Sequence, residues 1–299
     1  MSVVLKINNV TKRYKNNIAV NGISMTINKG DIYGFIGRNG AGKTTFMRLI
    51  LSLAQKDSGD VIFFGNQCIE QAGKKIGSLI EEPGLYKDAT AHENLKRFCI
   101  LYGSDCSKID ELLKLVGLEK AGKKKVKNFS LGMRQRLGIA IALLGEPEFL
   151  ILDEPVNGLD PYGMQEIREM ILKLNKEKNI TFLISSHYLD ELSKIVTKYG
   201  IIDKGVLVEE IEASELKEKC KDKIVVQVDD VKKAKEVLSA IIPSENIVEN
   251  NDFLEIYNYQ YDMSKINKIL SDNKIMVNSI YQNFTTIEEY FMNKIGGKL

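Results

Sequence analysis

The stretch GRNGAGKTT at residues 37–45 constrains the fold of this 299-residue chain more than any other part of it. It fits the phosphate-binding pattern G-x-x-x-x-G-K-[ST], follows the short apolar run DIYGFIG and precedes KTTFMRLILSL, whose apolar residues recur at helical spacing. A strand that ends in a glycine-rich turn and leads into a helix directs successive backbone N–H groups at a phosphate. We therefore expect an α/β nucleotide-binding domain. The residues expected to line its phosphate site are Gly37, Arg38, Asn39, Gly40, Ala41, Gly42, Lys43, Thr44 and Thr45.

Residues 1 to about 212 alternate between predicted strands and helices. DIYGFIG, EFLILDEP and ITFLISSH are short, nearly continuous apolar runs, as expected of strands buried on both faces. PYGMQEIREMILKLNKEKN has helical periodicity, and its first residue is a proline, which suits the first turn of a helix. This alternation predicts a largely parallel sheet with helices on its faces.

Two regions depart from this alternation. Between about 87 and 146, three helical patterns follow one another with no strand between them, which predicts a helical subdomain inserted in the α/β domain. After about residue 212, predicted strands in KIVVQV, FLEIYNYQ and IMVNSIYQNF are separated by two predicted helices. We expect residues 213–299 to form a small α+β domain of β-α-β-β-α-β type.

The overall composition excludes several classes of protein. The formal net charge of +2 gives no general attraction to nucleic acid. The four cysteines are scattered without a C-x-x-C pair, so we expect reduced thiols and no zinc site. The longest apolar run, about IAIALL, is far shorter than a spanning helix, and the first residues lack the apolar core of a signal peptide. We expect a cytoplasmic protein that meets a membrane only through a partner.

Acidic and imidazole side chains follow two further buried strands. FLILDEP places Asp153 and Glu154 at the carboxyl end of its strand, where ligands bind in open α/β sheets. We expect Lys43 to reach the β- and γ-phosphates, Thr44 and Asp153 to hold Mg²⁺, and Glu154 to polarise the attacking water. His187, one of two histidines, follows the strand ITFLISSH and is expected near the γ-phosphate.

A second candidate anion site lies in NFSLGMRQRLGIAIALL. Its Ser-x-Gly turn precedes a predicted helix, so the Ser130 hydroxyl and nearby N–H groups can bind an anion. One active site already has its glycine-rich loop. A second phosphate-binding turn in the same chain therefore suggests that this turn binds the nucleotide of another subunit.

Together these motifs resemble those of the nucleotide-binding subunits of ATP-binding cassette (ABC) transporters over about residues 3–210. GRNGAGKTT is similar to the Walker A motif, LILDEP to Walker B, SLGMRQR to the signature loop and NGLD, which ends at Asp160, to the D-loop. His187 matches the switch histidine and Tyr14 the aromatic residue that stacks on adenine. The resemblance implies that ATP and Mg²⁺ bind between two cassettes arranged head to tail, with Ser130 and Gly132 of one chain serving the nucleotide of the other.

The sequence departs from the family pattern at two places. Leu131 and Met133 replace a glycine and the glutamine of the signature loop, but the serine and second glycine remain. Glu81, in IGSLIEEPGLY, stands where the family usually has the Q-loop glutamine. The resemblance implies that Glu81 lies on the metal side of the site and takes part in coupling to the permease, with Glu82 facing solvent. The alternative is that Glu81 only caps a turn.

The resemblance also implies a function. IEEPGLY, SLGM and the C-terminal extension look most like ATPase subunits that export antimicrobial peptides, of the bacitracin-resistance and lantibiotic-immunity groups. The expected partners are a second ATPase subunit, as in a homodimer, and integral membrane permease subunits on whose cytoplasmic side the chain sits. The alternatives are a soluble ABC ATPase acting on nucleic acid or ribosomes, and a small-molecule kinase. For the C-terminal domain, a regulatory module, a dimer clamp and a stabilising extension all remain open.

Overall fold

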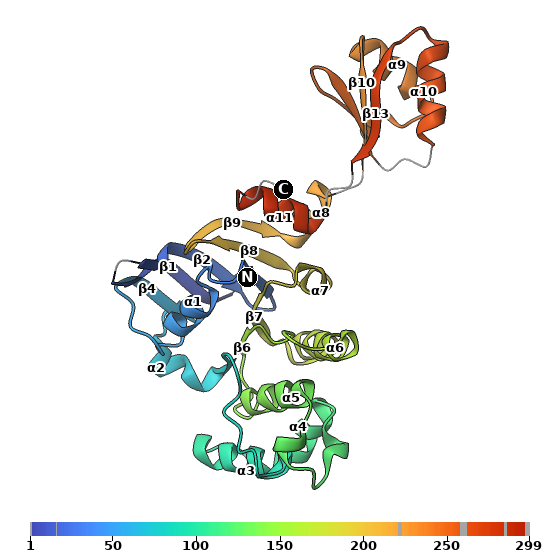
Figure 1. Cartoon of the computed structure of the whole chain (residues 1–299). Helices are drawn as coiled ribbons and strands as arrows, with labels where there is room; N and C mark the ends of the chain where they lie inside the picture. The colour runs from blue at the N-terminus through green and yellow to red at the C-terminus, as the bar shows by residue number, and fades with distance from the viewer. Residues whose placement is uncertain (1, 16, 221–222, 258–261, 284–285, 297–299) are drawn as a thin grey trace. The chain divides into compact units, whose positions relative to one another are not determined.

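The computed structural model describes residues 2–15, 17–220, 223–257, 262–283 and 286–296. The chain divides into two compact units, Met1–Ala213 and Ser214–Leu299, each with its own core (Figure 1). None of the helices in these ranges combines the length and the apolar character that a bilayer-spanning segment needs.

A six-stranded sheet forms the centre of the first unit, in the order β5-β6-β7-β3-β8-β9. Its strands pair in parallel except for the β8–β9 hairpin. Helix α1 (Lys43–Ile50) covers one face, and α6 (Pro161–Lys178) and α7 (Leu189–Ser193) cover the other (Figure 1). Because both faces are covered, every residue of β3, β6 and β7 is buried. The strands are β3 (Ile32–Ile36), β5 (Ile76–Leu79), β6 (Phe149–Asp153), β7 (Thr181–Ser186), β8 (Lys198–Asp203) and β9 (Val206–Glu212).

An antiparallel sheet of three strands belongs to the same unit. Its order is β2-β1-β4, with β1 spanning Val3–Tyr14, β2 Asn17–Asn28 and β4 Ser58–Phe63. Its apolar residues share one buried cluster with those of α1 and β3, in which the rings of Phe35 and Phe46 stack with their centroids 4.9 Å apart. Tyr14, the last residue of β1, remains 48% exposed. The short helix α2 (Ile69–Ala72) follows β4.

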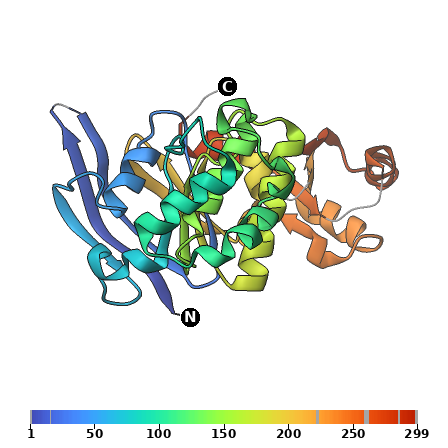
Figure 2. The ribbon, with the colours of Figure 1, turned by 90° about the horizontal axis from the view of Figure 1, so that it is seen from below.

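Three helices with no strand between them form a separate layer of the first unit, as the periodicity predicts. They are α3 (Ala91–Tyr102), α4 (Ile109–Leu115) and α5 (Leu131–Ala142), and they gather at one end of the unit (Figures 1 and 2). A capping box between Thr90 and Glu93 starts α3, and Gly103 ends it with a φ of 64°.

The expectation of four reduced thiols is wrong for Cys99 and Cys106, which a disulfide joins. Cys99 lies in the last turn of α3, and the left-handed turn at Gly103 sends the chain back toward that helix. The two Cα atoms consequently lie 5.7 Å apart, although the cysteines are seven positions apart in the sequence. Cys68 and Cys220 are free.

The second unit contains an antiparallel sheet in the order β11-β12-β10-β13. The element order β10-α9-β11-β12-α10-β13 is the predicted β-α-β-β-α-β, although β11 (Ile247–Glu249) is too short to be located from sequence. Residues 258–260 of the predicted strand FLEIYNYQ lie outside the described residues. Leu238 of α9 and Leu270 of α10 are buried in one apolar cluster with the strands. The remaining elements are α8 (Ala213–Lys219), α9 (Val231–Ser239), α10 (Met263–Asp272), α11 (Ile287–Lys294), β10 (Lys223–Val228), β12 (Phe253–Tyr257) and β13 (Val277–Asn283).

Candidate functional site

The predicted catalytic residues and two of the predicted metal ligands meet where three neighbouring parallel strands end. Strand β3 leads into the glycine-rich loop, β6 ends at Asp153 and β7 ends one residue before His187. Asp153 lies opposite Ser185, and Ile36 opposite Ser186, so these strand ends are in register. The carboxyl edge of the sheet therefore collects groups that are far apart in the sequence.

The glycine-rich loop adopts a backbone that side chains would obstruct. Gly42 has a φ of 107°, and a Cβ atom there would lie 2.4 Å from the carbonyl oxygen of Ala19. A Cβ atom at Gly37 would lie 2.4 Å from the carbonyl oxygen of Ile202. Gly42 is also the N-cap of α1, and no side chain caps this helix. The first N–H groups of α1 are thus left for a ligand such as phosphate.

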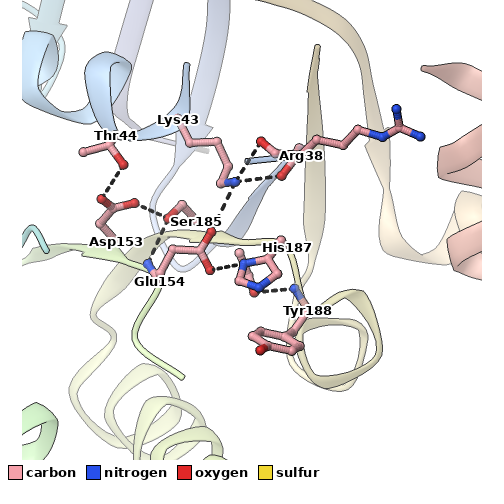
Figure 3. A network of polar contacts seen from close by, with 10 residues as sticks. Arg38, Lys43, Thr44, Asp153, Glu154, Ser185, His187 and Tyr188 are labelled. Atoms are coloured by element: carbon pink, nitrogen blue, oxygen red, sulfur yellow. Dashed lines mark hydrogen bonds and ion pairs between the residues drawn. The ribbon is translucent and has the colours of Figure 1, made fainter. Parts of the chain in front are cut away.

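Lys43 is the most deeply buried cation of the site, with 6% of its surface exposed. Its Nζ atom donates to the carbonyl oxygens of Gly37, at 2.7 Å, and Arg38, at 3.3 Å, and lies 3.2 Å from Oε1 of Glu154 (Figure 3). A buried ammonium needs such oxygen partners, since desolvation without them is costly. Three oxygen atoms surround it at the place where phosphate oxygens are expected.

Glu154 connects Lys43 with His187. Its Oε2 atom lies 2.8 Å from Nδ1 of His187, whose ring packs on the ring of Tyr188 with centroids 4.1 Å apart (Figure 3). The backbone of Glu154 has a φ of 50°, and its N–H group donates to the Ser185 hydroxyl at 2.9 Å. Glu154 thus bridges Lys43 and His187. From the sequence alone, these two residues could be placed only after two separate strands.

Thr44 and Asp153 form the second polar pair of the site. The Thr44 hydroxyl donates to Oδ2 of Asp153 at 2.7 Å, and the buried Ser185 hydroxyl donates to Oδ1 at 2.5 Å. Asp153 is only 4% exposed. Across the described residues, no group of three or more histidine, cysteine or acidic side chains could enclose a metal ion. One hydroxyl and one carboxylate suit Mg²⁺, which prefers oxygen ligands and keeps its other positions for water and substrate phosphate.

A cleft of about 500 Å³ opens beside the glycine-rich loop. Tyr14 lies at one part of its wall, and an Asp57 oxygen accepts from the Arg13 N–H at 2.6 Å next to it. That hydrogen bond lowers the pKa of Asp57 below its ordinary value. The cleft is large enough for a nucleotide, and it is lined both by Tyr14 and by Lys43, which are far apart in the sequence. Its lining comprises Tyr14, Asn17, Ile18, Ala19, Asn39, Gly40, Gly42, Lys43, Thr44, Thr45, Glu154, Asn157, Lys204 and Gly205.

Two features of the site were missed by sequence reasoning. Ser185, fully buried, bonds both Asp153 and the Glu154 backbone, but in the sequence it is one of two serines inside an apolar strand. Lys204 and Gly205 form the tight turn of the β8–β9 hairpin, where the Gly205 N–H donates to the carbonyl oxygen of Ala41 at 2.9 Å. A Lys-Gly pair between two strands indicates a turn, yet nothing in its composition indicates that the turn lines the cleft.

Most of the signature and D-loop residues lie away from this cleft, although Asn157, the first residue of NGLD, lines it. Ser130 is the N-cap of α5, its hydroxyl accepting from the Met133 N–H at 3.2 Å, and Gly132 is in the first turn of the same helix. Asp160 caps α6 by accepting from the Gly163 N–H at 3.1 Å. Ser130, Gly132 and Asp160 are absent from the lining of the cleft beside Lys43.

Glu81 lies apart from the other predicted metal ligands. Its Oε1 atom accepts from Nη2 of Arg48 at 2.6 Å, and 57% of its side chain is exposed. Among the contacts of the described residues, Glu81 makes none with Thr44 or Asp153. The structure therefore brings together two of the three predicted metal ligands. Glu82 is exposed, as expected.

Comparison with known proteins places these features in a family. Residues 20–157 match the family model described as ABC transporter. A bacitracin transport ATP-binding protein of Bacillus licheniformis is 41% identical over 99% of this chain and 99% of its own length. A lantibiotic transport ATP-binding protein of Streptococcus pyogenes is 46% identical over 70% of this chain and 91% of its own.

Solved structures show the same fold. The ADP conformation of an ATP-binding cassette of an ABC transporter superposes with a TM-score of 0.64 at 27% identity, over 71% of this chain and 92% of that one. A dimeric cassette in a post-hydrolysis state, bound to ADP and Pi, superposes with a TM-score of 0.62 at 25% identity, over 70% of this chain and 98% of that one.

Proposed function

The chain belongs to the family of ABC transporter ATP-binding proteins, and on this premise we propose that it binds and hydrolyses ATP to power export of a peptide antibiotic of bacitracin or lantibiotic type. The peptide would cross the membrane through separate permease subunits. The observation that supports hydrolysis most directly is the placement of Glu154 between Lys43 and His187, beside the glycine-rich loop.

These contacts suggest how hydrolysis proceeds. Phosphate oxygens of ATP replace the oxygen partners that Lys43 now has, which include Oε1 of Glu154. The released oxygen of Glu154 can then accept a hydrogen bond from the attacking water. We propose that His187, which contacts Oε2 of Glu154 and the Tyr188 ring, donates toward the γ-phosphate.

Thr44 and Asp153 are the residues that would hold Mg²⁺, and Glu81 is proposed as a third oxygen on the same side. When bound, Mg²⁺ neutralises charge on the β- and γ-phosphates. Ser185 keeps the Asp153 carboxylate and the Glu154 backbone in position for this role. Tyr14 provides the exposed ring on which adenine stacks.

A second cassette, in a homodimer, completes the site. Ser130 and Gly132 begin α5 and do not line the cleft of their own chain, so we propose that they contact the ATP held by the partner. The first N–H groups of α5 and the Ser130 hydroxyl are suited to the γ-phosphate. The dimeric solved cassette supports this arrangement.

The proposed place of work is the inner face of the cell membrane, where the chain docks on the permease subunits. The names of the curated relatives support transport rather than action on nucleic acid or ribosomes. Residues Met1–Ala213 form the ATPase domain of this proposal, with the layer of α3, α4 and α5 as its helical subdomain, and residues Ser214–Leu299 form an accessory domain.

Replacing the proposed base tests this function. Glu154→Gln is expected to lower ATP turnover by about 100-fold or more, because an amide cannot accept the proton of water. The variant should still bind ATP and should form a stable dimer, measured by light scattering. Adding Ser130→Ala to it should return the protein to a monomer. Glu146→Gln, which alters an exposed glutamate paired with Lys108, is the matched control.

Two results would contradict the proposal. Normal turnover in Glu154→Gln would remove Glu154 from the role of base, and an ATP-loaded monomer would remove the partner contact.

The transport substrate is tested in cells that lack the gene. They should become more sensitive to a bacitracin-like or lantibiotic peptide, and the natural chain, but not Glu154→Gln, should restore resistance.

A further inference from the structure

An ion pair joins the helix that follows the glycine-rich loop to the loop that contains Glu81. Arg48 lies in the last turn of α1, the helix that begins at Lys43. Glu81 lies two residues beyond the end of β5, which pairs with β6, the strand that ends at Asp153. The Arg48 Nη2 atom donates to Oε1 of Glu81 at 2.6 Å. The pair therefore connects the helix that contains Thr44 with the loop that follows β5, the strand beside β6.

Stability does not explain this pair. The side chains of Arg48 and Glu81 are 43% and 57% exposed, and exposed ion pairs contribute little to folding. Glu81 also has a φ of 60°, a left-handed conformation that is unfavourable for a glutamate. Glu146, which is exposed and pairs with Lys108, has a similar φ of 49°, so the backbone conformation alone assigns no role to Glu81, and the case for a function depends on charge.

Charge supplies such a role. In the proposed role, a Glu81 carboxylate that moved to the metal would bring a negative charge beside the phosphates of ATP, whereas an amide there would be neutral. The guanidinium of Arg48 compensates that charge while no nucleotide is bound. It also holds the carboxylate away from Thr44 and Asp153, which contact each other directly.

We propose that Arg48 is a positioning residue that retains the Glu81 carboxylate outside the metal site until nucleotide and metal draw it in. Glu81 thus has two alternative partners, the guanidinium and the metal, and the equilibrium between them sets how readily the metal site is completed. This inference depends on the proposed role of Glu81 beside the metal.

A double-mutant cycle on the full chain tests the proposal by equilibrium binding. Mn²⁺, which takes the same oxygen ligands as Mg²⁺, is titrated into wild type, Arg48→Gln, Glu81→Gln and the double variant, each with a non-hydrolysable ATP analogue. Free Mn²⁺ is measured by electron paramagnetic resonance. Glu81→Gln should weaken Mn²⁺ binding. Arg48→Gln should tighten it by about two- to fivefold, because Glu81 no longer has a competing partner.

The cycle separates an effect through Glu81 from any other effect of Arg48. In the Glu81→Gln background, Arg48→Gln should leave the Mn²⁺ affinity unchanged, and Arg48→Lys should behave nearly as wild type. The control is Lys75→Gln, which breaks another exposed pair, Lys75–Glu148, with similar exposures of 47% and 43%. It should have no effect.

Each adverse outcome identifies what fails. If Arg48→Gln changes Mn²⁺ affinity equally in both backgrounds, or in neither, Arg48 does not act through Glu81, and the positioning proposal is overturned while the proposed function stands. If Glu81→Gln leaves Mn²⁺ affinity unchanged, Glu81 is not a metal-side residue, and the positioning proposal fails with that assignment. The ATPase proposal is then still decided separately by Glu154→Gln.

Discussion

The two units of the chain differ most clearly in what they bury. In the first unit, several polar or charged side chains are buried among apolar neighbours. At the site, Lys43 donates a hydrogen bond to the Gly37 carbonyl oxygen, and the Ser185 hydroxyl donates one to Asp153. Within the described part of the second unit, no polar or charged residue is that deeply buried. Burying a polar group costs free energy unless it is fully paired. The first unit tolerates this cost where phosphate chemistry requires buried charge, whereas the second is built as a simple apolar core.

The second unit keeps even its best-placed ion pair partly in solvent. Lys223 lies 2.5 Å from Glu255, and their side chains are 23% and 15% exposed. Burial by itself raises the pKa of Glu255, but hydrogen bonds from Lys223 and Tyr257 outweigh it, so the pKa lies below its ordinary value. The comparison predicts that substitutions in the two units separate into effects on ATP turnover and effects on stability alone.

Among the substitutions that test this comparison, Ser185→Ala is expected to have the largest effect on turnover. The variant removes the donor to Oδ1 of Asp153 and the acceptor of the Glu154 N–H, so turnover should fall by about 10- to 100-fold. The Mg²⁺ concentration at half-maximal rate should rise, while ATP binding without Mg²⁺ stays the same. Thr181→Val is the matched control, since it removes a buried hydroxyl from the same strand that accepts from the Gly30 N–H instead. Equal losses in both variants would reduce Ser185 to a structural role.

A smaller effect is expected from Lys204→Gln, which changes one charge in the wall of the cleft. ATP and ADP should bind about two- to fivefold more weakly, and this difference should shrink at high salt because the charge is exposed. Fluorescence titration at two salt concentrations measures both effects. Lys204 has a φ of 45°, and Lys274 in the second unit has a similar φ of 59° but does not line the cleft, so Lys274→Gln serves as control. Identical affinities for Lys204→Gln and wild type would show that the turn only closes the hairpin.

The smallest effect on turnover is expected from Leu254→Ala, in the core of the second unit. Leu254 is fully buried, so the substitution should destabilise that unit by about 2–5 kcal/mol while turnover stays within about twofold. Calorimetry and an ATPase assay on the same protein measure both. Leu183→Ala makes the equivalent cavity in the first unit and should lower turnover as well as stability. If Leu254→Ala lowers turnover as much as Leu183→Ala does, the second unit takes part in hydrolysis.

Sequence reasoning located what is local. The glycine-rich loop, the buried strands β3, β6 and β7, the layer of three helices and the element order of the second unit all follow from period, turn residues and short motifs. The placement of Lys43, Asp153, Glu154 and His187 at one sheet edge also follows, because parallel strands end on the same side. The elements depend on contacts between near neighbours in the chain, which the sequence encodes directly, and their common edge follows from the parallel sheet that the strand–helix alternation predicts.

Only the tertiary structure decided which groups touch. Glu154 bonds His187, 33 residues away, and Thr44 bonds Asp153 across 109 residues. Sequence reasoning could not identify the roles of Ser185, Lys204 and Arg48, the partner of Glu81. Each of these residues acquires its role from a residue far along the chain. The same holds for the disulfide, since only the turn at Gly103 brings Cys106 back to Cys99. Period and motif determine which elements form, whereas packing of those elements determines which side chains meet.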